Sequence, residues 1–129
     1  MIFNLLVTGP LYSSQSGYSA LRFSEAAVAA GHTISQVFFY QDGVSQASRL
    51  STPLEDEFDP ARQWVRFADL HAVPLIMCVS AGERRGLMSD IQALEYELGS
   101  GSSNSSFQVA GLGVLHQASL ESDRTVSFK

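Results

Sequence analysis

The stretch Val73-Pro74-Leu75-Ile76-Met77-Cys78-Val79 is the clearest buried strand in the chain, and it contains the only cysteine. A short apolar run bounded by polar residues is typical of a strand inside a parallel sheet. The run leads into a small, polar and basic segment, Ser80-Ala81-Gly82-Glu83-Arg84-Arg85-Gly86, for which we expect a loop. Cys78 is therefore expected at the carboxyl end of a buried strand.

Strand and helix signals alternate along the rest of the chain. Other strands are expected at residues 2–7, 33–40, 107–110 and 125–128, and helices at residues 18–30, 59–71, 89–98 and 112–121. Asp59-Pro60 is a strong helix start, and Ile91, Leu94 and Leu98 are expected to face the core. This alternation predicts one domain, residues 1–129, of α/β class with a mostly parallel central sheet of about five strands.

Charge and composition exclude several classes of function. The formal net charge is −5, and the only lysine is Lys129. Because the sequence contains no cluster of basic residues large enough to neutralise phosphates, direct nucleic-acid binding and binding to an anionic membrane are not expected. The N-terminal residues 1–7 are typical of a first strand, not a signal peptide, and no apolar run approaches the ~20 residues of a transmembrane helix. We expect a reducing cytoplasm, in which a lone thiol stays available for chemistry.

Cys78 is the main candidate for a reactive residue. The thiolate is the nucleophilic form of cysteine, and nearby positive charge favours it, so Arg84 and Arg85 are candidate stabilisers, with Glu83 opposing them. The other interpretation is that Cys78 is a small core residue. The histidines lack metal-site spacing, and residues 8–17 lack a phosphate-loop signature, so we expect neither a metal nor an organic cofactor.

Five short segments follow one another along nearly the whole chain. They are Val7-Thr8-Gly9-Pro10-x-Tyr12, Val37-Phe38-Phe39-Tyr40-x-x-Gly43-Val44, Asp56-Glu57-Phe58-Asp59, Cys78-Val79-x-Ala81-x-x-Arg84-Arg85-Gly86 and Gly111-Leu112-Gly113. In this order they resemble the TusD/DsrE family of sulfurtransferase subunits. The reactive cysteine of that family falls on Cys78, and the pair Arg84-Arg85 also matches.

The resemblance implies a three-layer α/β/α sandwich and a cysteine that carries sulfur as a persulfide. It also implies a heterohexamer with two related small subunits, of the TusB/TusC or the DsrH/DsrF kind. An upstream protein would donate the persulfide sulfur and a downstream protein would accept it, for 2-thiouridine formation in tRNA or for sulfur trafficking in sulfur-oxidising bacteria.

Two other functions stay open. In the first, the chain is a non-catalytic assembly subunit and Cys78 is inert core. In the second, residues 8–17 bind a nucleotide or a flavin, as in flavodoxin-like proteins. Slow alkylation of the native protein is expected of the first, and stabilisation by a nucleotide is expected of the second.

Overall fold

The computed structural model describes all of residues 1–129 and contains one five-stranded sheet. The strands are β1 (Ile2–Val7), β2 (Thr33–Phe39), β3 (Leu75–Cys78), β4 (Phe107–Ala110) and β5 (Arg124–Phe128). Their order across the sheet is β4-β3-β2-β1-β5, and every neighbouring pair is parallel. The predicted α/β class with a parallel central sheet is confirmed.

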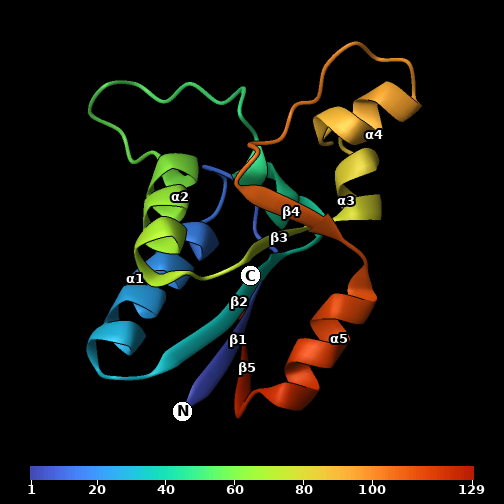
Figure 1. Cartoon of the computed structure of the whole chain (residues 1–129). Coiled ribbons are helices and arrows are strands. Elements are labelled where there is room, and N and C mark those ends of the chain that lie inside the picture. The colour runs from blue at the N-terminus through green and yellow to red at the C-terminus, as the bar shows by residue number, and fades with distance from the viewer.

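Helices lie on both sides of this sheet. They are α1 (Ser16–Ala29), the 3-10 helix η1 (Gln41–Ala47), α2 (Pro60–His71), α3 (Val79–Glu83), α4 (Asp90–Glu95) and α5 (Leu112–Glu121). Figure 1 shows α1 and α2 on one side of the sheet, α5 on the other, and α3 and α4 beyond the end of β3. The three layers of the predicted sandwich are therefore present. None of the helices is both long and apolar enough to cross a bilayer.

The core between the sheet and α2 is aromatic. As the sequence predicts, α2 begins at Pro60 with Asp59 as its N-cap, and the Asp59 carboxylate accepts a hydrogen bond from the Arg62 N–H at 3.2 Å. The helix directs Trp64 onto Phe39 of β2, with ring centroids 5.4 Å apart and nearly perpendicular rings. Edge-to-face packing of this kind adds about 0.5–1.5 kcal/mol to the burial of the rings. Phe39 also contacts Phe107 of β4, so one ring joins three elements.

The register of β3 decides which face of the sheet Cys78 belongs to. Phe107 packs with Phe39 on the side of α2, and it is paired with Leu75 of β3. Successive side chains of a strand point to opposite faces. Leu75 and Met77 therefore lie on the α2 side, whereas Ile76 and Cys78 lie on the side of α5.

Two expectations about the segment after Cys78 are wrong. Residues 79–83 form the helix α3 and are not part of a loop, because the chain enters helical geometry at Val79, directly after the extended Cys78. The stripe predicted to face the core, Ile91, Leu94 and Leu98, is exposed to solvent. In its place α4 buries Gln92 and Ala93.

The orientation of α4 has a polar cause. Ser89 caps the helix by accepting a hydrogen bond from the Gln92 N–H, and the Gln92 side chain accepts one from the Ser89 N–H. The same Gln92 side chain donates to the Glu83 carboxylate at 3.0 Å. These contacts draw Gln92 inward and turn the apolar stripe outward, so polar contacts override the hydrophobic pattern here.

Candidate functional site at the end of strand β3

Cys78 occupies the junction between strand and helix. It is the last residue of β3 and the N-cap residue of α3, and it is paired with Ala110 of β4. Because β3 lies between β2 and β4, the segments that flank Cys78 are those that begin at Tyr40 and at Gly111. The segment after β1, residues 8–15, is two strands away.

The thiol of Cys78 is buried. Its residue is 1% exposed and belongs to the main hydrophobic core cluster. The Sγ atom lies 3.8 Å from the Oγ atom of Ser80, which is itself exposed. Ser80 was not predicted from sequence. The sequence does place a hydroxyl residue two positions after the cysteine at the strand end. This spacing indicates a contact between the two side chains only if the residues after the cysteine are known to form a helix.

Arg85 is held in place by two acceptors. Its Nε donates to the Asp42 carboxylate at 2.9 Å, and its Nη1 donates to the Ala81 carbonyl at 3.1 Å. The pair joins the end of α3 to η1, which follows β2. Asp42 therefore offsets part of the positive charge of Arg85, and it was missed because it is far from Arg85 in sequence.

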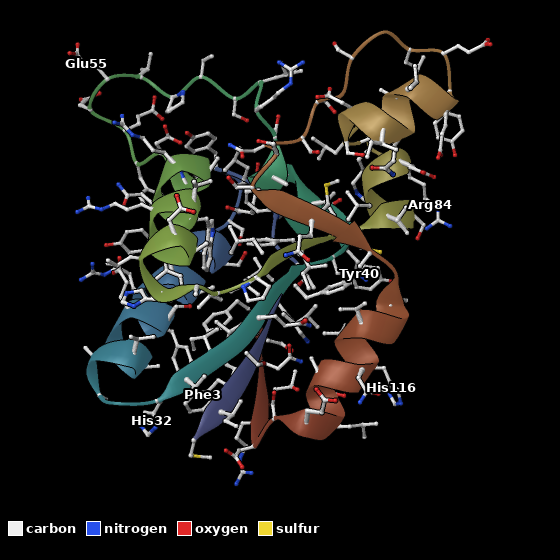
Figure 2. All side chains as sticks on the ribbon, viewed as in Figure 1. Phe3, His32, Tyr40, Glu55, Arg84 and His116 are labelled. Carbon is white, nitrogen blue, oxygen red and sulfur yellow. The ribbon has the colours of Figure 1, made fainter.

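Arg84 has a different environment from Arg85. Its guanidinium group makes no hydrogen bond or ion pair, and Figure 2 shows it at the outer surface beside α3. Both arginines follow Cys78 closely in the sequence, and in the structure only Arg84 has no carboxylate partner.

Glu83 is directed toward α4. Its carboxylate accepts hydrogen bonds from the Gln92 side chain at 3.0 Å and from the Tyr96 hydroxyl at 3.2 Å. The hydrogen bond to Glu83, and its negative charge, raise the pKa of Tyr96 above the ordinary value of 10.0. The acidic residue beside the arginines therefore acts as a link between α3 and α4.

Other parts of the molecule lack a comparable constellation. No group of three or more His, Cys, Asp or Glu side chains comes together as a metal site. In the segment after β1, the Leu11 N–H donates to the Ser45 hydroxyl and the Ser16 N–H donates to the Ser14 hydroxyl. A surface hollow of about 1020 Å³ lies between residues 53–59 and α2, and none of residues 78–86 lines it.

Comparison with known proteins decides the family. The DsrE/DsrF-like family matches residues 1–128 of the chain. The chain belongs to the DsrE/DsrF-like family. Its sequence is 44% identical over 128 residues to Sulfurtransferase TusD of Proteus mirabilis (strain HI4320), and the match covers 99% of this chain and 98% of that protein. These matches confirm the predicted family and the predicted class, a sulfurtransferase.

A solved structure supports the fold independently. The crystal structure of the ychN protein from E. coli aligns with a TM-score of 0.76, covering 99% of this chain and 100% of that chain. The two sequences are only 19% identical, so this likeness concerns the fold alone.

Proposed function

We propose that this chain, acting as a single domain over residues 1–129, relays sulfur as a persulfide on Cys78. The observation that carries the proposal is the position of the only cysteine at the carboxyl end of β3. Reactive groups of parallel α/β sheets gather beyond this end of the strands. The 44% identity to a sulfurtransferase supports the same conclusion.

The transfer has two steps. The Cys78 thiolate attacks the outer sulfur of a donor persulfide, R–S–SH. A new S–S bond forms on Cys78, the donor S–S bond breaks, and the donor leaves as the thiolate R–S⁻. The thiolate of an acceptor protein then attacks the outer sulfur of Cys78–S–SH, takes that sulfur and releases the Cys78 thiolate.

The reactive residues of the chain are sufficient for this chemistry. The transferred sulfur keeps its oxidation level, so neither step requires a redox cofactor. Because Cys78 is the only cysteine, no second thiol of the chain can displace the sulfur as an internal disulfide. The Ser80 hydroxyl, 3.8 Å from Sγ, is placed to stabilise the thiolate and the persulfide anion. Arg84, which has no carboxylate partner, is the arginine that adds positive charge, and Arg85 contributes less because Asp42 offsets its charge.

Access to the sulfur requires local opening. A thiol in a residue that is 1% exposed cannot meet a protein-bound persulfide in this conformation. We propose that α3 opens, since this helix has five residues and buries only Ala81 and Gly82. Segments with few buried contacts are the ones that open at low free-energy cost.

The setting follows from the family resemblance. We propose that the chain is a cytoplasmic subunit of a heterohexamer with two related small subunits of the TusB/TusC kind, and that its sulfur serves 2-thiouridine formation in tRNA. The TusD name of the relative favours this route over the DsrH/DsrF assembly of sulfur oxidation. Helix α5 suits a subunit contact, because it has no buried residue and exposes Leu112, Val114 and Leu120.

Loading of Cys78 tests the proposal directly. The purified chain is incubated with a small-molecule persulfide, and intact mass is measured. We expect a gain of one sulfur atom in the native chain and no gain in Cys78→Ser. A Cys78→Ser protein that still gains sulfur, or a native chain that gains none, contradicts the proposal.

The burial of Cys78 favours one second candidate, a non-catalytic assembly subunit. In that case Cys78 stays protected, and the native chain reacts with alkylating agents only as fast as it unfolds globally. Comparing the alkylation rate with the global unfolding rate, measured on the same protein, separates the two functions.

A further inference from the structure

Three large aliphatic side chains form an exposed stripe at α4. Ile91, Leu94 and Leu98 are 74%, 75% and 57% exposed. Their spacing of three and four residues places the two helical residues on one side of α4, with Leu98 just beyond its end. We call these three residues the α4 stripe. Large apolar side chains that are exposed close together in a chain mark interaction sites more often than single exposed ones do.

The α4 stripe is connected to Cys78 through helix α3 and the hydrogen bonds between α3 and α4. Gln92 and Tyr96, from α4 and its end, both donate hydrogen bonds to the carboxylate of Glu83, the last residue of α3. Helix α3 in turn begins directly after Cys78. Figure 1 shows α3 and α4 stacked beyond the ends of β3 and β4. A protein that covers α4 therefore acts on the helix that must open to expose the sulfur.

The charge around the stripe indicates the kind of partner. Glu95 and Glu97 are exposed beside it, and the sequence contains no lysine or arginine between Arg85 and Arg124. An apolar surface with an acidic rim is complementary to a surface with apolar and basic side chains. A second copy of this chain fits poorly, because two chains of formal net charge −5 repel each other.

We propose that the α4 stripe is the docking surface for the cysteine-bearing protein that accepts sulfur from Cys78, and that this acceptor docks through an apolar and basic segment. The inference rests on the proposed function of Cys78.

Two synthetic helical peptides, each with one cysteine, test the proposal. The first also contains leucine and arginine residues, and the second has glutamate at each arginine position. The chain is loaded by a small-molecule persulfide, and transfer of one sulfur to each peptide is followed by mass spectrometry. At low ionic strength we expect the arginine peptide to accept sulfur at least about tenfold faster, a difference that salt reduces. Equal rates for the two peptides overturn the proposal.

Substitutions locate the surface. Leu94→Asp is expected to slow transfer to the arginine peptide at least about fivefold, through lost apolar contact. Leu70→Asp is the matched control, because Leu70 is 72% exposed on α2, and it leaves this rate unchanged. The rate of sulfur transfer to free cysteine is expected to be the same in the native chain, Leu94→Asp and Leu70→Asp. If Leu94→Asp transfers to the peptide at the native rate, or changes the oligomeric mass of the protein, the docking proposal is overturned.

Binding separates this inference from the proposed function. Fluorescence anisotropy of the labelled arginine peptide, with its cysteine blocked, measures docking without any sulfur transfer. Binding that Leu94→Asp weakens supports the docking surface even if Cys78 cannot be loaded, in which case only the proposed function fails. Successful loading without peptide binding rejects the docking surface and leaves the proposed function intact.

Discussion

The Sγ atom of Cys78 lies 3.8 Å from the Oγ atom of Ser80, across the first turn of the helix that follows the strand. A hydroxyl group donates a hydrogen bond to a thiolate, and the anion accepts it more strongly than a neutral thiol does. Ser80 is therefore the side chain through which the protein most directly influences the reactivity of its only cysteine.

We expect Ser80→Ala to slow sulfur loading of Cys78 roughly fivefold, which corresponds to the loss of about 1 kcal/mol of hydrogen bonding in the transition state. Ser80→Thr retains the hydroxyl and keeps most of the rate. Loading is followed by intact mass at fixed persulfide concentration. Because Ser80 is exposed, the free energy of unfolding changes by less than about 0.5 kcal/mol, and an alanine variant that loads at the native rate contradicts the role.

The two arginines behind Cys78 are predicted to differ. Arg85 is paired with Asp42 at 2.9 Å, whereas the guanidinium of Arg84 has no carboxylate partner. With an anionic persulfide as donor, we expect Arg84→Ala to slow loading more than Arg85→Ala does. Asp42→Asn frees Arg85 and speeds loading, and added salt diminishes each difference.

The Arg85–Asp42 pair is predicted to contribute little to stability. Both side chains are partly exposed, at 36% and 62%, so solvent screens their attraction. A double-mutant cycle of Arg85→Ala and Asp42→Ala in urea unfolding is expected to give a coupling of about 0.2–1 kcal/mol. A coupling well above this range would mean that the pair is more protected from water than its exposure indicates.

The titration of Tyr96 reports the contact between α3 and α4. The Glu83 carboxylate accepts a hydrogen bond from the neutral phenol and raises the pKa of Tyr96 above 10.0. The contribution of this hydrogen bond to the stability of the folded protein is therefore complete below pH 10, and it is lost as the pH rises through the raised pKa of Tyr96. Glu83→Gln removes the charge, and we expect the pKa of Tyr96 to fall toward its ordinary value. Tyrosinate absorbance during a pH titration measures this, and Tyr96→Phe identifies the transition.

Gly82 is predicted to be required for the packing of α3. A Cβ atom at this position would lie 2.6 Å from the carbonyl oxygen of Leu87 and 3.2 Å from the Cε atom of Met77. Gly82→Ala is therefore expected to lower the free energy of unfolding by about 1–3 kcal/mol. Gly113→Ala in α5 is the matched control, since nothing lies within 4 Å of its Cβ position, and it is expected to be neutral or stabilising. Urea unfolding compares the two variants.

Local signals predicted the regular elements well. The strand at residues 107–110 and the helix at residues 112–121 have the predicted bounds, and α2 ends at His71 as expected. Gly31, which follows the first helix, has a φ of 88°, a left-handed conformation that glycine adopts readily. These features depend on capping residues, turn residues and short-range periodicity, and all of these are contained in a few neighbouring positions.

The site was predicted only in part. The sequence located Cys78, Arg84 and Arg85, but not Ser80 or Asp42. It also predicted a loop where α3 begins, because a five-residue helix rich in small residues leaves almost no periodic signal. The roles of these residues in sulfur transfer stay predictions until loading is measured.

The sequence by itself determined the alternation of strands and helices and the position of one cysteine at the end of an apolar run. Only the tertiary structure decided that β3 lies between β2 and β4, that Cys78 is 1% exposed, and that the α4 stripe faces solvent. Strand order depends on pairing between residues far apart in the chain. The orientation of α4 depends on Glu83 and Gln92, whose hydrogen bond outweighs a local hydrophobic pattern once α3 and α4 are packed together.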